Sequence, residues 1–244
     1  MPEGTGRILD SRTLASSHRR LSELLRPGLS VLDVGCGTGA ITRGIAKAVG
    51  PAGRAVGVDI NADLIAAARI HSADTESLSF QVADIYSLPF TDEYDIVAAA
   101  RVIQWLSEPE AAITSMIDAT RGGGRVLILD YNHEKIEWKP SPPRSMQAFY
   151  SAFLRWRSDA GMDNAIANHL YALFQKCGLA EVVEMSQCEA TNRAQKDFIS
   201  AIGIWADVAA SRGRQMVKDG FISETERSTA ETEYRNWIES EAES

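Results

Sequence analysis

The stretch with the most specific chemistry is a short apolar run that ends in closely spaced glycines. Residues 31–39 read VLDVGCGTG, with glycines at Gly35, Gly37 and Gly39, and a helical pattern follows. Glycine lets the backbone turn tightly and come close to a ligand. The start of a helix offers unpaired N–H groups to a carboxylate or a phosphate. We therefore expect a ligand-binding turn here, with Cys36 near the ligand but without a chemical role.

Asp33, just ahead of the glycines, indicates which ligand the turn takes. Gly35, Gly37 and Ala40 also satisfy the G-x-G-x-x-G/A pattern of dinucleotide sites. A carboxylate at the mouth of such a turn would repel a pyrophosphate and attract cations. S-adenosylmethionine (SAM) carries an ammonium and a sulfonium and has no phosphate, so it suits Asp33 better than a dinucleotide does.

Two more acids follow at the expected ends of the next two strands. Asp59 comes about twenty residues after the glycines, where a carboxylate commonly accepts hydrogen bonds from ribose hydroxyls, in SAM and NAD sites alike. Asp84 is placed to accept from an adenine amino group, with Ile60 and Ile85 flanking the ring.

These motifs together resemble the class I SAM-dependent methyltransferases, over roughly residues 25–132. Within that superfamily the chain is most similar to the small-molecule enzymes of the ubiquinone and menaquinone biosynthesis type. The resemblance implies SAM as cofactor, S-adenosylhomocysteine as product, and a 3-2-1-4-5-7-6 strand order. The matching segments, in the family's order and spacing, are VLDVGCGTG (31–39), GVDI (57–60), VADIYSLPF (82–90) and RGGGRVLIL (121–129).

Polar residues that follow the fourth and fifth strands are candidates for the reaction itself. The resemblance implies that backbone near Arg101 lines the cofactor cleft, although the Arg101 side chain is equally compatible with a surface position. His133 could act as a general base toward the methyl acceptor, since the pKa of histidine lies near neutrality; a solvated loop histidine is the alternative. Tyr131 could position the acceptor. For His18, on a predicted helix, we expect a packing or surface role.

The elements that must carry these residues alternate between strand and helix. Apolar runs at 30–35, 54–60, 79–85, 94–101 and 125–132 predict five buried strands, with helices between them. This alternation predicts a doubly wound, mostly parallel α/β sheet of the Rossmann-like methyltransferase type. Ser107 with Glu110, and Ser223 with Glu226, are spaced as capping boxes that would open two helices.

The rest of the chain predicts a division into five segments. An N-terminal helical segment (1–29) precedes the SAM-binding core (30–132) and a helical lid or acceptor region (133–178). A sixth strand (179–190) and C-terminal helices (191–244) follow, with no convincing seventh strand. Aromatic residues in the lid region can form either an apolar acceptor pocket or plain core; they are Trp138, Phe149, Tyr150, Phe153 and Trp156.

Composition excludes several classes of function. The formal net charge is −8 and the basic residues are scattered, which argues against a nucleic-acid partner. No apolar run approaches the ~20 residues of a membrane span. The three cysteines form no CxxC pair, so we expect no metal centre and reduced thiols in a cytoplasm.

The sequence as a whole predicts a methyltransferase acting on a small molecule that has an apolar or aromatic portion. A monomer and a homodimer are equally compatible with it. Two alternatives stay open, an NAD-dependent Rossmann oxidoreductase and a non-catalytic SAM-binding protein.

Overall fold

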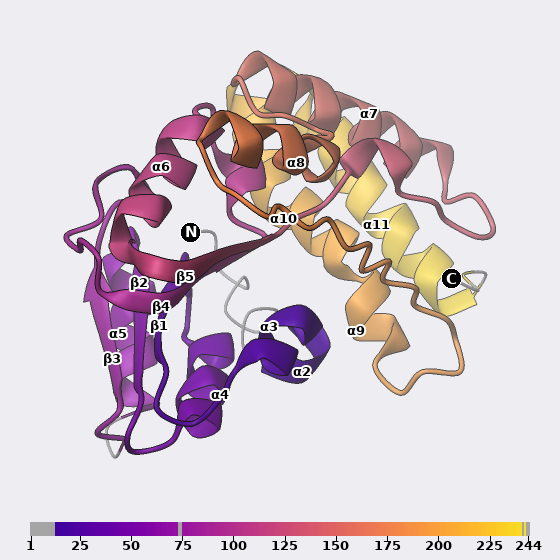
Figure 1. The fold of residues 1–244 in the computed structure, drawn as a ribbon. Coiled ribbons are helices and arrows are strands. Elements are labelled where there is room, and N and C mark those ends of the chain that lie inside the picture. Colours follow the sequence, from indigo (N-terminus) through magenta and orange to yellow (C-terminus); the bar gives the residue numbers. More distant parts are fainter. Residues whose placement is uncertain (1–12, 73–74, 241, 243–244) are drawn as a thin grey trace. The chain divides into compact units, whose positions relative to one another are not determined.

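The computed structural model describes residues 13–72, 75–240 and 242. It divides into two compact units, which we describe separately (Figure 1). Among the described residues, the sheet unit comprises residues 13–72, 75–131 and 165–182, and the helical unit comprises residues 132–164, 183–240 and 242. The predicted start of the chain, residues 1–12, lies outside the described residues.

The sheet unit is built on five parallel strands in the order β3-β2-β1-β4-β5. This order and the helices that flank the sheet confirm the predicted doubly wound α/β fold. The strands are β1 (Ser30–Val34), β2 (Arg54–Asp59), β3 (Leu78–Val82), β4 (Tyr94–Ala100) and β5 (Thr120–Leu129). The helical elements are α2 (Leu14–Ser17), α3 (Arg19–Leu24), α4 (Ala40–Val49), α5 (Ala62–Ile70), η1 (Ile85–Ser87), η2 (Ile103–Trp105), α6 (Pro109–Ala119) and α8 (Ile166–Lys176).

Alternate residues of β1 divide the core of the sheet unit between its two faces. Val31 packs with Leu14 and Ile45, from α2 and α4, on one face. Leu32, on the opposite face, belongs to a cluster that includes Met116 of α6 and is completed by Ile166 of α8. Because side chains of a strand alternate between faces, Asp33 shares the α4 face with Val31.

Two sequence predictions about the sheet are wrong. Residues 179–190 form no strand; they are irregular and largely exposed, because their β-forming side chains find no neighbouring strand to pair with among the described residues. β5 begins at Thr120 rather than near 125. The glycine trio 122–124 therefore belongs to this strand and does not separate it from the preceding helix.

The helical unit comprises η3 (His133–Lys135), α7 (Arg144–Asp159), α9 (Phe198–Ile202), α10 (Ile204–Lys218) and α11 (Glu224–Ser240). In Figure 1, α7, α10 and α11 pack side by side. The predicted Ser223–Glu226 capping box is present: the Ser223 N–H donates to Glu226 (2.7 Å), and the Glu226 N–H donates to the Ser223 hydroxyl (3.2 Å).

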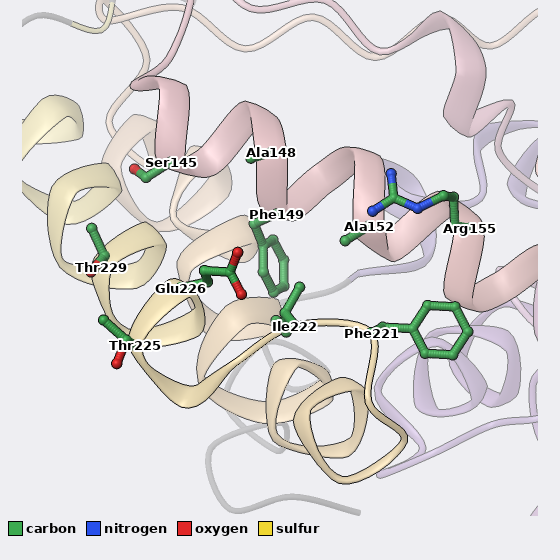
Figure 2. Close-up of a pocket in the computed structure, with 10 residues that line it drawn as sticks. All are labelled: Ser145, Ala148, Phe149, Ala152, Arg155, Phe221, Ile222, Thr225, Glu226 and Thr229. Atoms are coloured by element: carbon green, nitrogen blue, oxygen red, sulfur yellow. The ribbon is translucent and has the colours of Figure 1, made fainter.

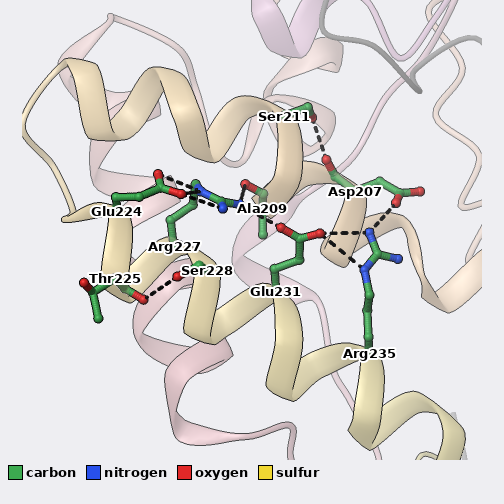
Figure 3. A network of polar contacts seen from close by, with 9 residues as sticks. All are labelled: Asp207, Ala209, Ser211, Glu224, Thr225, Arg227, Ser228, Glu231 and Arg235. Atoms are coloured by element: carbon green, nitrogen blue, oxygen red, sulfur yellow. Dashed lines mark hydrogen bonds and ion pairs between the residues drawn. The ribbon is translucent and has the colours of Figure 1, made fainter.

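A buried arginine joins α10 to α11 (Figure 3). Arg227 donates to both carboxylate oxygens of Glu224, to Glu231 at 2.7 Å and to the Ala209 carbonyl at 3.2 Å. These carboxylates raise the pKa of Arg227, so the guanidinium is fully charged inside the bundle. Arg235 extends the network at its exposed end, to Glu231 and Asp207.

Candidate active site

The glycine turn between β1 and α4 has a backbone that glycine alone adopts easily. Gly35, Gly37 and Gly39 have φ values of 71°, 56° and 77°. A Cβ at Gly35 would lie 2.4 Å from Val102, and a Cβ at Gly39 would lie 2.5 Å from the Phe80 ring. At these two positions the glycine backbone lies against other side chains of the protein. Glycine is therefore required there by the packing of the turn itself, independently of any ligand.

The end of β2 holds this turn in place. The N–H groups of Gly35 and Cys36 both donate to the Val58 carbonyl, at 2.7 and 2.9 Å. The Gly37 N–H donates to the Asp59 carboxylate at 2.9 Å. α4 then begins at Ala40, and the first N–H groups of a helix have no partner within it. The turn thus has a rigid frame and a helix start suited to a carboxylate.

Asp59 binds its own backbone with both carboxylate oxygens. Oδ2 accepts from Gly37, and Oδ1 accepts from the Asn61 N–H at 2.9 Å. A carboxylate has about four lone-pair directions, so acceptor capacity remains for two hydroxyl groups. The next residue, Ile60, is 70% exposed, which is unusual for a large aliphatic side chain at the end of a central strand. An exposed apolar side chain beside a half-buried acid fits the nucleoside site predicted here.

Asp33 lies beneath the turn rather than at its mouth, where we expected it. Its side chain is only 3% exposed and accepts a 2.6 Å hydrogen bond from the Thr42 hydroxyl of α4. Burial raises the pKa of Asp33 to about 7, with the Thr42 hydrogen bond opposing this change and the nearby Asp59 charge adding to it. Asp33 therefore influences the turn as a buried, titrating carboxyl group.

The predicted adenine-side residues lie at the end of β3. Asp84 caps η1 by accepting from the Tyr86 N–H at 3.0 Å, and its side chain is partly exposed. Ile85 is partly buried and packs against the core cluster that contains Leu32. Asp84 thus has a local structural partner in addition to any contact with a ligand.

Arg101 directly follows β4 and is buried, with 8% of its surface exposed. Its backbone is left-handed, with φ 62°, and its N–H donates to the Leu129 carbonyl at 2.7 Å. The side chain donates to the Tyr131 hydroxyl through Nε and to the Ser17 carbonyl through Nη1 at 3.2 Å. The guanidinium links the end of α2 to the end of β5. The surface position that the sequence left open for the Arg101 side chain is therefore not supported.

The two residues predicted to act on the acceptor fall in different units. Tyr131, in the sheet unit, is partly buried against Arg101. His133, in the helical unit, is buried, and its carbonyl accepts from the Tyr150 hydroxyl at 2.6 Å. Burial, with the charge of Arg157 as a second cause, lowers the pKa of His133 to about 3, so its imidazole is neutral at pH 7.

The aromatic residues of the helical unit form a packed cluster around His133. Ring centroids of Trp205 lie 4.7 Å from Tyr150 and 5.8 Å from Phe153, in edge-to-face arrangements. The Trp138 indole N–H donates to the Tyr234 hydroxyl at 3.0 Å. Such packing is the core interpretation that the sequence had left open.

The helical unit also contains a cavity of about 260 Å³ between α7 and the start of α11 (Figure 2). Phe149 and Ile222 point toward each other along it, and Glu226 lies at one side (Figure 2). The lining surface of the cavity is mostly apolar. The carboxylate of Glu226 already accepts a hydrogen bond from the Ser223 hydroxyl.

Three further buried polar residues lie near the glycine turn and the strand ends of the sheet unit. Thr38, within the turn, has a hydroxyl with no hydrogen-bond partner among the described residues. His18, between α2 and α3, is buried, which agrees with packing, one of the two roles expected for it. Gln104 is buried after β4, and its N–H donates to Asp130 at 3.1 Å. Thr38 was not singled out from the sequence as a buried, unpartnered group, although this residue lies inside the motif.

Cys36 remains a thiol in this environment. Burial and the negative charges of Asp33 and Asp59 raise its pKa well above the usual range. A thiol is a poor nucleophile compared with a thiolate.

Among residues 13–72, 75–240 and 242, no group of three or more His, Cys, Asp or Glu side chains is arranged to hold a metal ion. No helix in the described part of the chain has the length and hydropathy needed to span a membrane.

Comparison with known proteins agrees with this geometry. A family model described as a methyltransferase domain matches residues 25–198. A ubiquinone/menaquinone biosynthesis C-methyltransferase of Burkholderia cenocepacia is 34% identical over 137 residues, which are 54% of this chain and 53% of the relative. The chain thus spans about half the length of the curated relatives of this type that it matches.

Solved structures show the same fold at low sequence identity. A SAM-dependent methyltransferase from Aquifex aeolicus is 18% identical and has a TM-score of 0.56, covering 74% of this chain and 89% of its own. The [4+2]-cyclase SpnF is also 18% identical with a TM-score of 0.56, covering 97% and 78%. The family match covers more than half of the residues, and the described sheet has the 3-2-1-4-5 part of the strand order that the resemblance implies, without strands 6 and 7. The chain belongs to the class I SAM-dependent methyltransferase family.

Proposed function

We propose that this protein binds SAM along the carboxyl ends of β1, β2 and β4 and transfers its methyl group to a small organic molecule. The observation that supports this most directly is the pair of acids at the glycine turn. Asp59 borders the turn and Asp33 lies under it, close enough for the Asp59 charge to raise the pKa of Asp33. A diphosphate would be repelled there, whereas a sulfonium and an ammonium would be attracted.

The residues around the turn fit the parts of this cofactor. In the proposal, Asp59 accepts from the ribose hydroxyls with its remaining lone pairs, and Ile60 covers one face of the adenine. Asp84 and Ile85 hold the adenine edge. The turn residues Gly35, Cys36, Gly37 and Gly39 approach the methionine portion, together with backbone at Arg101. The exposed Ile60 side chain is the feature that such a ligand would cover.

When bound, SAM supplies an electrophilic methyl group on a sulfonium. The task of the protein is then to align the acceptor, and such alignment can contribute about 7–11 kcal/mol. Tyr131 is held by Arg101, so its hydroxyl is a fixed group for positioning an acceptor. Proton abstraction by His133 remains a prediction, and a pKa near 3 makes this side chain a weak base.

The acceptor is proposed to have an apolar or aromatic portion. The curated relatives act in ubiquinone and menaquinone biosynthesis according to their names, and they match about half of their length to this chain. An acceptor with a ring would be consistent with that likeness. An NAD-dependent oxidoreductase is disfavoured by the two acids and by the family match.

Calorimetry with S-adenosylhomocysteine, SAM and NAD tests the cofactor. We expect both adenosyl ligands to bind and NAD to show no heat. Asp59→Asn should weaken S-adenosylhomocysteine binding about tenfold or more, because one carboxylate oxygen becomes an amide donor. Glu76→Gln, at an exposed residue of the same unit, controls for loss of an acid. Unchanged affinity in the Asp59 variant would remove the ribose assignment.

Incubation with methyl-labelled SAM and a fractionated metabolite extract tests the transfer. Label should appear in a small molecule and not in protein or nucleic acid. Binding of SAM without any labelled product, across acceptors with and without aromatic rings, would favour a non-catalytic SAM-binding protein instead.

A further inference from the structure

His18 occupies an unusual position for a titratable side chain. It ends α2 and begins α3, with φ −152° and ψ 62°, and its ring caps neither helix. Its surface is only 3% exposed. Neither ring nitrogen has a hydrogen-bond partner among the residues that the structure describes. Buried polar side chains nearly always have partners, and leaving one without costs about 1–3 kcal/mol.

The surroundings of His18 belong to the cofactor edge of the sheet unit. The preceding carbonyl, that of Ser17, accepts from Arg101 Nη1. Arg101 follows β4 and its Nε donates to Tyr131, which follows β5. In open α/β sheets, ligands bind outside these carboxyl ends of the strands. His18 therefore directly follows a residue that is bonded at the edge of the sheet where a ligand is expected.

The state of the ring limits what it can bind. Burial, then the charge of Arg101, lowers the pKa of His18 to about 4. Arg101 is the only charged group of α2, α3, β4 or β5 in the described chain that contributes to this change. At pH 7 the imidazole is neutral, so one nitrogen donates a hydrogen bond and the other accepts one. The neighbouring Arg101 guanidinium favours a ligand with negative charge.

We propose that His18, beside Arg101, donates a hydrogen bond to a carboxylate of the bound ligand. A phosphate is the less suitable anion because Asp33 and Asp59 lie at the same edge. The carboxylate has two possible sources, the amino-acid end of the cofactor or an acidic methyl acceptor. This inference rests on the proposed function, since it assigns a residue to that same site.

NMR of the imidazole groups separates the two sources. The protein has four histidines, and the signal of His18 is assigned by its loss in His18→Gln. S-adenosylhomocysteine carries a carboxylate, whereas 5′-methylthioadenosine has the same nucleoside without the amino-acid end. A His18 response to the first but not the second identifies the cofactor carboxylate. A response only when benzoate is added to the saturated S-adenosylhomocysteine complex identifies an acidic acceptor.

Affinity measurements supply a second readout. If the cofactor carboxylate is the partner, His18→Phe should lower the affinity for S-adenosylhomocysteine about tenfold and leave that for 5′-methylthioadenosine unchanged. His18→Gln keeps an N–H donor and should retain most of the affinity. Circular dichroism and thermal melting establish that each variant is folded.

The inference is overturned if the His18 signal responds to none of the three ligands, or responds equally to both nucleosides. If the wild-type protein fails to bind S-adenosylhomocysteine at all, the proposed function fails instead. The two failures are therefore distinguishable in one set of titrations.

Discussion

Replacing Asp33 by Asn should make the ligand-free protein more stable above pH 7 and less able to bind SAM. Asp33 is buried, and its pKa in the folded protein is raised from 3.8 to about 7. In the unfolded chain the carboxyl group ionises near its ordinary value. Between about pH 4 and pH 7 the folded protein therefore holds a proton that the unfolded chain has lost.

The sign of the effect follows from this difference. Folding binds a proton in that window, so the free energy of unfolding falls as the pH rises from about 4 to about 7 and then stays level. A difference of about 3 pH units, at about 1.4 kcal/mol per unit, gives a penalty of about 4 kcal/mol above pH 7. The Asn amide does not ionise, so Asp33→Asn removes this penalty. Burying the amide N–H₂ group without a partner costs about 1–3 kcal/mol, which offsets part of the gain in stability.

Urea unfolding of both proteins at pH 5, 6, 7 and 8 measures the effect. The stability of Asp33→Asn relative to wild type should increase between pH 5 and 7 by about 2 kcal/mol and level off by about pH 8. Thr42→Val removes the hydrogen bond that opposes the raised pKa, so its pH-dependent fall should extend to higher pH. A stability difference between wild type and Asp33→Asn that is the same at pH 5 and pH 8 would refute the reasoning.

Ligand binding provides the complementary result. A bound sulfonium and ammonium favour the ionised form of Asp33, so binding should release a proton near pH 6–7 and strengthen as the pH rises. Calorimetry in two buffers of different ionisation enthalpy detects that proton. Asp33→Asn should bind SAM more weakly than wild type and release none from this position.

Gly39→Ala should cost more than about 3 kcal/mol in unfolding experiments, because its Cβ would meet Phe80 at 2.5 Å on a backbone with φ 77°. Gly178→Ala is the matched control: φ is 82° but no atom lies within 4 Å, so a loss of about 1–2 kcal/mol is expected, and equal losses would contradict the steric argument. Arg227→Met should destabilise by about 1–3 kcal/mol through loss of its buried hydrogen bonds. Arg235→Met, at a half-exposed position of the same network, should change stability by less than about 1 kcal/mol; if it matched Arg227→Met, burial would not be the deciding factor.

The sheet and its turn were predictable because their signals are local. Each of the five strands contains a short apolar run, and the glycines mark a turn whose left-handed backbone few other residues adopt. Asp59 was placed correctly at the end of β2, because its distance from the glycines follows from one strand–helix–strand repeat. The sequence did not show that its carboxylate also binds the turn itself.

The failures came from contacts between distant parts of the chain. Ser107 and Glu110 have capping-box spacing, yet α6 begins at Pro109 without a side-chain cap, and Glu110 pairs with Lys176 of α8 at 2.5 Å. Ser223 and Glu226 lack such a competing partner in the described chain and do form the box. Asp33 was misplaced for the same reason, because its burial beneath the turn depends on contacts with α4.

The route of the chain between the two units has a practical consequence. The polypeptide leaves the sheet unit after Tyr131, returns for residues 165–182 to supply α8, and leaves again. Ile166, Leu170 and Leu173 of that returning segment complete the core cluster around Leu32. A gene fragment that stops at residue 131 would therefore keep α6 on this face of the sheet but leave the part that α8 packs against uncovered. Efforts to express the sheet unit alone must splice residues 165–182 back onto it, or keep the whole polypeptide.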